Sequence, residues 1–164
     1  MRRAAPNLAW VAESRLHLTI EFLGERSERE VERLHAALGE VAARHRPFAL
    51  ALRGFGAFPN LRAPRIVWLG VDPEPRLELL QHELARACAE LGYEREARAF
   101  RPHITLGRAR TPLNADGARA LARAARAVEW NATAEAKSVD IMKSRLLPDG
   151  ARYELLHAIP LGGR

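Results

Sequence analysis

The stretch "ESRLHLTIEFLGE" (residues 13–25) contains a pattern that predicts a β-strand with a histidine in it. Apolar residues alternate with other residues between positions 15 and 23, as they do in a strand with one buried face. His17 and Thr19 fall on the other face, because residues i and i+2 of a strand point the same way. A strand over 15–23 would therefore present an imidazole beside a hydroxyl. The alternating apolar residues are Leu16, Leu18, Ile20 and Phe22.

The same pattern occurs a second time, in "AFRPHITLGR" (99–108), where His103 precedes Thr105 by two residues. The two histidines are 86 residues apart, which is a little over half the chain. Each half holds a histidine strand, a helix and then two strands, so the sequence predicts a duplicated lobe with one histidine in each copy. If the two lobes face each other, two imidazoles and two hydroxyls meet in one cleft.

The rest of the chain predicts helices and strands in mixed order, which is typical of an α+β fold. Ser27 and Glu30 form a capping box that opens a helix ending near Arg44. A second helix begins near Pro75 and ends before Gly92, and a third begins at about Asp116. The predicted strands, besides 15–23, are 48–55, 65–71, 103–107, 128–134, 138–146 and 152–159, the last two separated by a turn at 147–151.

Composition limits the class of protein. The 164 residues include 48% hydrophobic and 28% charged residues, which is typical of a globular domain. No apolar run approaches the roughly 18 to 20 residues that span a bilayer. Because Cys88 is the single cysteine, no internal disulfide can form, and we expect a cytoplasmic protein. The net charge of +6 favours polyanionic partners such as nucleic acid, although the charge alone is weak support.

Paired imidazoles and hydroxyls suit phosphoester chemistry. One histidine can remove a proton while the other donates one, because imidazole titrates near neutrality. Threonine hydroxyls can donate hydrogen bonds to phosphate oxygens, and an arginine can hold the same oxygens by charge. Arg108 follows His103 by five residues, and simple alternation puts it on the opposite face, unless a bulge at Gly107 reverses it. The sequence shows no cysteine cluster or paired carboxylates, so we expect no metal and no other cofactor.

The remaining histidines and aromatic residues lack this pattern. We expect the three histidines within predicted helices to be solvated and His157 to be structural. Trp68, Phe58 and Phe22 are expected in the core instead of stacking on a nucleobase. The three helical histidines are His35, His45 and His82.

The two motifs and their flanks resemble the 2H phosphoesterase superfamily, which is named for two H-x-[ST]-x motifs. The closer resemblance is to bacterial and archaeal RNA 2′,3′-cyclic phosphodiesterases, also called 2′-5′ RNA ligases. It rests on four stretches that span residues 15–156 in the family's order: "RLHLTIEFLGE", "GAFPNLRAPRIVWLGV", "FRPHITLGRAR" and "SRLLPDGARYELL".

The resemblance implies one bilobal 2H phosphoesterase domain over residues 1–164, with two antiparallel sheets and flanking helices around a V-shaped cleft. It implies metal-independent hydrolysis of a 2′,3′-cyclic phosphate, at an RNA end or in a nucleotide, to a 2′-phosphate, and reversal of the reaction as 2′-5′ RNA ligation. We expect a monomer that does not bind membranes. Family chains usually carry a strand and a helix before the first motif, and these are expected to be lacking here, which would leave an exposed sheet edge.

The resemblance also implies roles for five residues. His17 and His103 match the two catalytic positions, and by similarity His103 is the base that activates water while His17 protonates the departing 3′ oxygen. The phosphate-binding residues that it implies are Thr19, Thr105 and Arg108. Two alternatives stay open: a binding module that holds a nucleotide or RNA end without turnover, and a phosphodiesterase for a small cyclic phosphate such as ADP-ribose cyclic phosphate.

Overall fold

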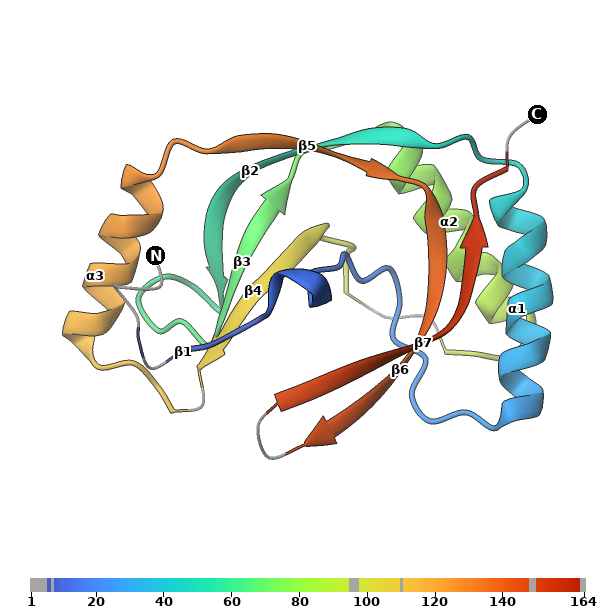
Figure 1. The fold of residues 1–164 in the computed structure, drawn as a ribbon, viewed down its shortest axis with the longest axis horizontal. Coiled ribbons are helices and arrows are strands. Elements are labelled where there is room, and N and C mark those ends of the chain that lie inside the picture. Colours follow the sequence, from blue (N-terminus) through green and yellow to red (C-terminus); the bar gives the residue numbers. More distant parts are fainter. Residues whose placement is uncertain (1–5, 7, 95–97, 110, 148–149, 163–164) are drawn as a thin grey trace. The chain divides into compact units, whose positions relative to one another are not determined.

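The computed structural model describes all residues except 1–5, 7, 95–97, 110, 148–149 and 163–164 (Figure 1). The chain forms two compact units, and each unit collects three separate segments of the sequence. The first unit contains residues 1–19, 51–72 and 101–134, and the second contains residues 20–50, 73–100 and 135–164. Both histidine motifs belong to the first unit. The expectation that each half of the sequence forms a lobe with its own histidine is therefore wrong.

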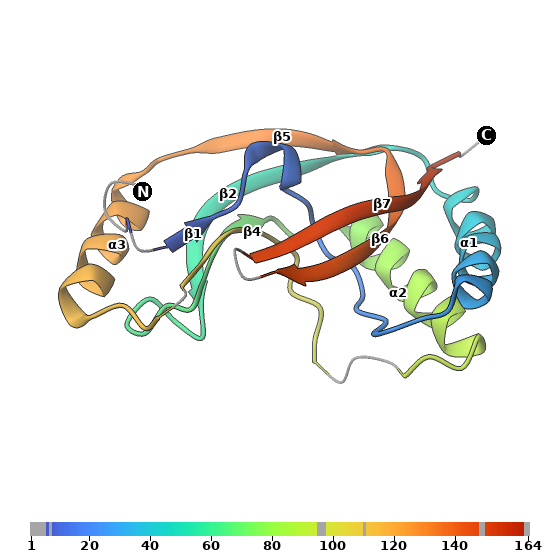
Figure 2. The same ribbon diagram turned by 60° about the horizontal axis from the view of Figure 1, so that its bottom comes forward.

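The first unit is built on a five-stranded sheet with the strand order β1-β4-β3-β2-β5 (Figures 1 and 2). β4 pairs in antiparallel orientation with β1 and β3, and β3 does so with β2. The predicted strands at 48–55, 65–71 and 103–107 are all present, and the ends of β2 and β5 extend into the second unit. The strands are β1 (Leu8–Trp10), β2 (Phe48–Phe58), β3 (Ile66–Val71), β4 (His103–Ala109) and β5 (Asn131–Ala136).

One face of this sheet is buried in a core with helix α3 (Ala115–Ala127). The helix begins after Asn114, whose side-chain oxygen accepts a hydrogen bond from the Gly117 N–H. Leu121 of α3 is fully buried and packs with Leu8 of β1 and Val67 of β3. Along β3, buried residues alternate with half-buried ones, so the second face of the sheet remains partly accessible.

The predicted strand over 15–23 is wrong. A 3₁₀ turn at Glu13–Arg15 interrupts the chain where it runs beside β4, and afterwards only Leu18 pairs with the sheet, through an isolated bridge. The chain passes into the second unit at Ile20, so the following residues have no ladder partner in this sheet. Phe22, predicted to be in the core, is 67% exposed. The strand that does pair here is the three-residue β1, which the sequence analysis did not predict.

The second unit consists of two helices and a hairpin, which Figure 2 shows in orange-red. The helices are α1 (Glu28–Ala42) and α2 (Pro75–Glu90), and the antiparallel hairpin strands are β6 (Ser138–Leu147) and β7 (Gly150–Pro160). These elements confirm the predictions, while the predicted turn falls partly on residues outside those described. Burial of the Cys88 thiol in α2 raises its pKa to about 11. Among the described residues, no helix has the length and apolar character needed to cross a membrane.

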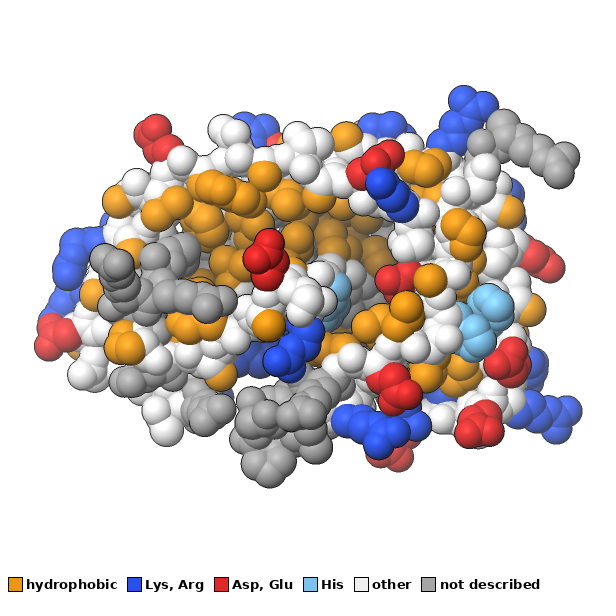
Figure 3. Space-filling view, in the orientation of Figure 1, with side chains coloured by type: hydrophobic (Ala, Val, Ile, Leu, Met, Phe, Trp, Pro, Cys, Tyr) orange, Lys and Arg blue, Asp and Glu red, His pale blue; other side chains and the backbone are white. Residues whose placement is uncertain are grey.

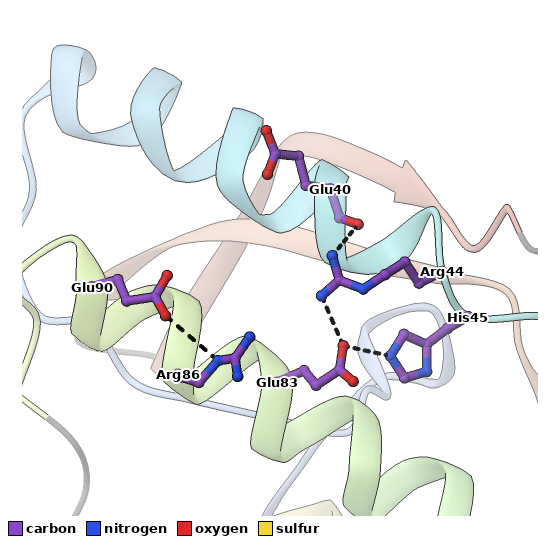
Figure 4. A network of polar contacts seen from close by, with 6 residues as sticks. All are labelled: Glu40, Arg44, His45, Glu83, Arg86 and Glu90. Carbon is purple, nitrogen blue, oxygen red and sulfur yellow. Dashed lines mark hydrogen bonds and ion pairs between the residues drawn. The ribbon is translucent and has the colours of Figure 1, made fainter.

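Polar contacts join the turn that follows α1 to α2 (Figure 4). Glu83 of α2 accepts a hydrogen bond of 2.9 Å from Arg44 Nη2 and lies 3.3 Å from His45 Nε2. The bond from Arg44 is the main cause that holds the pKa of the Glu83 carboxyl below its usual value. His45 was expected to be solvated, and this expectation is wrong: its side chain is buried directly after α1, with the Glu83 carboxylate as its polar partner.

The capping box at the start of α1 yields a stability prediction. Ser27 Oγ accepts a bond from the Glu30 N–H, and the Glu30 carboxylate accepts one from the Ser27 N–H. Replacing Ser27 by alanine removes the cap, so we expect the free energy of unfolding to fall by about 1 kcal/mol, measured by urea denaturation. Ser144→Ala, on the exposed face of a strand, is the matched control. Equal stability of the two variants would contradict the assignment.

Candidate active site

Strand β4 contains a β-bulge in the middle of the second motif region. Val67 of β3 pairs with Gly107, whereas the next residue, Trp68, pairs with Thr105. Leu106 is therefore an extra residue on β4, without a partner of its own in this ladder. An extra residue shifts the alternation of side chains on the strand by one position. The bulge lies directly before Gly107, the residue at which a bulge was expected if Arg108 is to share the face of His103.

The bulge brings three of the predicted site residues onto one face of the sheet. Residues that pair directly across an antiparallel ladder point to the same face. His103, Thr105 and Arg108 pair with three alternate residues of β3, which share a face because a strand has a period of two. Without the bulge, Arg108 would point to the opposite face. The β3 partners are Gly70, Trp68 and Ile66, in that order.

The first motif lies beside the second. Leu18 forms an antiparallel bridge with Ile104, so these two residues share the buried side of the sheet. His17 and Thr19 flank Leu18 in the way that the second motif's histidine and threonine flank Ile104. If the backbone on each side of the bridge alternates as a strand does, all four project to the same face. Because the bridge is antiparallel, each histidine is brought beside the threonine of the other motif.

Both imidazoles are oriented by the same local contact. His17 Nδ1 lies 2.9 Å from the carbonyl oxygen of Arg15, and His103 Nδ1 lies 2.7 Å from the carbonyl oxygen of Arg101. A carbonyl oxygen can only accept, so in each ring Nδ1 carries the hydrogen and donates it. Nε2 is then the nitrogen that takes up or releases a proton. Each histidine is thus held in the tautomer that suits proton transfer at Nε2.

Two aromatic side chains pack beside His103. The Phe58 ring meets the His103 ring edge-on with centroids 5.0 Å apart, and Trp68 lies 6.3 Å from His103 and 5.4 Å from Phe58. Both were expected in the core, but they are half-buried on the site face of the sheet. This position of the two rings beside His103 was not predicted. The sequence does hold a sign of this position: Trp68 and Ile66 are two residues apart in a predicted strand and therefore share one of its faces.

Gly56 makes room for this aromatic group. Gly56 pairs with Trp68, and a Cβ at this position would meet the Trp68 ring at 2.2 Å, which is too close for any contact. Gly56→Ala therefore has to displace the Trp68 indole, which packs against Phe58. We expect a loss of about 1–3 kcal/mol in unfolding free energy, measured by thermal or urea denaturation. We also expect lower turnover of the substrate proposed below.

Gly39→Ala is the control for this substitution, because a Cβ there meets nothing within 4 Å and the residue lies inside helix α1. Alanine is the better helix former, so this variant should be at least as stable as the parent protein. A Gly56→Ala variant as stable and active as Gly39→Ala would contradict the role of the close contact.

The family model described as the 2′-5′ RNA ligase superfamily matches residues 1–144. An RNA 2′,3′-cyclic phosphodiesterase of Geobacillus stearothermophilus is 42% identical over 103 residues, which cover 63% of this chain and 33% of that protein. The protein of the same name from Methanothermobacter thermautotrophicus is 31% identical over 153 residues, covering 93% of this chain and 82% of that one.

Among solved structures, the chain is similar to E. coli LigT complexed with 3′-AMP. The two are 28% identical with a TM-score of 0.69, over 94% of this chain and 82% of that chain. The likeness covers both units and agrees with the expected α+β class with two sheets.

Proposed function

The chain belongs to the 2′-5′ RNA ligase superfamily, and from this premise we propose that it hydrolyses 2′,3′-cyclic phosphates of RNA ends and nucleotides to 2′-phosphates. The observation that carries the proposal is the bridge between Leu18 and Ile104, which sets the two histidine motifs side by side. Relatives named RNA 2′,3′-cyclic phosphodiesterases support the substrate class.

In the proposed mechanism His103 acts as the general base. Its Nε2 removes a proton from water, which attacks the phosphorus opposite the 3′ oxygen. The bond from phosphorus to the 3′ oxygen breaks, and His17 Nε2 gives its proton to that oxygen. The product carries a 2′-phosphate, and each proton transfer contributes about 10²–10⁴-fold to the rate. The contacts of both Nδ1 atoms with backbone carbonyls support these roles.

Thr19, Thr105 and Arg108 stabilise the phosphate in this proposal. Two hydroxyls donate hydrogen bonds to the non-bridging oxygens, where negative charge increases in the transition state. The exposed guanidinium of Arg108 adds charge-assisted hydrogen bonds to the same oxygens. The bulge in β4 supports this assignment, because it brings the arginine to the face of the two histidines.

Incubation with 2′,3′-cyclic AMP in excess EDTA tests the proposal. We expect 2′-AMP as the product, because the proposed reaction breaks the bond between phosphorus and the 3′ oxygen. EDTA should not prevent its formation, because the two imidazoles supply both proton transfers. Formation of 3′-AMP instead would overturn the direction of ring opening. No product from a folded protein, with saturable binding of 2′-AMP, would favour a binding module over an enzyme.

A second experiment distinguishes an RNA end from a small nucleotide as the preferred substrate. With a net charge of +6, the chain should favour a longer polyanion. We expect kcat/KM to be higher for an oligonucleotide with a 2′,3′-cyclic phosphate than for the cyclic mononucleotide, and this advantage should shrink with added salt. Equal values at all salt concentrations would point to a small cyclic phosphate as the substrate.

A further inference from the structure

A second group of histidines lies in the other unit, between helix α1 and strand β7. Glu32 and His35 are three residues apart on α1, so they occupy one face of the helix. His157 of β7 stacks on His35 with ring centroids 4.2 Å apart and ring planes 17° from parallel. Its Nε2 lies 3.4 Å from Glu32 Oε1. In Figure 3 histidine atoms reach the surface beside acidic side chains in the region of α1.

We propose that Glu32, His35 and His157 bind a divalent transition-metal ion of the zinc class. Each residue offers one ligand atom, and all three atoms lie within 4.8 Å of one another. Two imidazole nitrogens and one carboxylate oxygen form a donor set that zinc accepts in proteins.

The spacing of the donor atoms fits this ion once one imidazole turns out of the stack. Four ligands at zinc's usual bond lengths lie about 3.4 Å from one another in a tetrahedron. The pair formed by His157 Nε2 and Glu32 Oε1 has this separation already. The His35 ring must rotate out of its stack on His157, because the nitrogen lone pairs of two nearly parallel rings do not point to one ion. Both rings are half-buried and the carboxylate is exposed, so water can complete the coordination.

The proposed ion would connect two elements that are distant in sequence. Glu32 and His35 lie near the start of α1, while His157 follows more than a hundred residues later in the hairpin. α1 packs against β7, so binding requires no rearrangement of the two elements. A ligand that binds only the folded protein raises the melting temperature, and the ion should do so here. The site shares no residue with the proposed phosphodiesterase site, so the two proposals stand or fall separately.

A different account of the same contacts needs no metal. A protonated His157 would form an ion pair with Glu32, and His35 would only stack against it. This account predicts no saturable metal binding and no change in melting temperature with zinc.

The test is zinc titration of the untagged protein after removal of metals with EDTA and exchange into metal-free buffer. Calorimetry should show one saturable site, and zinc should raise the melting temperature. When Co²⁺ is used in place of zinc, the bound ion should show the visible absorption of four-coordinate Co²⁺. His35→Ala, His157→Ala and Glu32→Gln should each weaken binding at least about tenfold, since removing even an outer-shell partner commonly costs that much.

His82→Ala is the matched control, because it removes an exposed histidine of α2 and should leave zinc affinity unchanged. Histidine NMR signals of the parent protein give a readout that does not depend on the folding of variants. Zinc should shift the imidazole signals of two of the six histidines, His35 and His157. Absence of saturable binding, equal loss of affinity in His82→Ala, or shifts of His17 and His103 instead would overturn the proposal.

Discussion

Replacement of His103 or of His17 by alanine is expected to lower kcat/KM for 2′,3′-cyclic AMP by about 10²–10⁴-fold in each case. In the proposed mechanism each substitution removes one of the two proton transfers. The kcat/KM of the double variant should be only slightly lower than that of the less active single variant. In the proposed mechanism both residues serve the same chemical step, so their effects are not additive. Each variant should keep its fold, since both imidazoles are only half-buried at the surface of the sheet.

The leaving group separates the two roles. Bis(4-nitrophenyl) phosphate releases nitrophenolate, which departs without protonation, so an acid contributes little. The loss of activity in His17→Ala should therefore be far smaller with this substrate than with the cyclic nucleotide. The loss in His103→Ala should remain. The opposite pattern would exchange the acid and the base, and full activity of both variants with either substrate would contradict the mechanism.

His82→Ala is the control for both histidine variants. This residue is exposed on α2 and lies outside both motifs. Its loss should leave kcat/KM for the cyclic nucleotide and for the nitrophenyl ester unchanged. A similar decrease in this variant would show that histidine loss acts through the stability of the protein instead of through chemistry.

Replacement of Arg108 by alanine is expected to lower kcat/KM by about 10²–10³-fold, the size commonly found when one donor to a developing negative charge is removed. In the proposed mechanism the guanidinium reaches the phosphate, because the β4 bulge turns position 108 to the face of His103. Arg108→Lys should recover only part of the activity, because lysine keeps the charge but loses the planar pair of donors. Initial rates with 2′,3′-cyclic AMP at low and high salt measure the effect.

Arg86→Ala provides the matched change of charge, on the exposed face of α2. It should alter the salt dependence with oligonucleotides at most slightly and leave turnover of the mononucleotide unchanged. If Arg108→Ala is as active as Arg86→Ala, the guanidinium does not bind the phosphate, and the bulge does not serve to orient it.

The helices and most strands follow from short-range patterns in the sequence. The capping box of Ser27 and Glu30 acts within four residues, and the buried stripe that ends in Val41 has the period of a helix. β3 and β4 likewise appear where apolar residues cluster between turn residues. The candidate site residues could be named for the same reason, since each motif is complete within three residues.

Pairing between distant segments could not be predicted in this way. Nothing near Leu18 in sequence reveals that it meets the sheet at one bridge, or that β1 occupies the edge before the 3₁₀ turn. The bulge at Leu106 depends on the register with β3, which is a property of two strands and not of one. The burial of His45 likewise depends on Glu83 from another helix.

The interleaving of the two units bears on how the chain acquires its structure during synthesis. The first unit lacks one of its three segments until residue 134 has been made, and the second also requires residues from 135 onward. Contacts between such distant segments are entropically costly to close, which slows folding and favours one late, cooperative step. Fragments that end between residues 72 and 101 should therefore remain unstructured on the ribosome and be sensitive to proteases, with both histidine motifs becoming functional only after the chain is nearly complete.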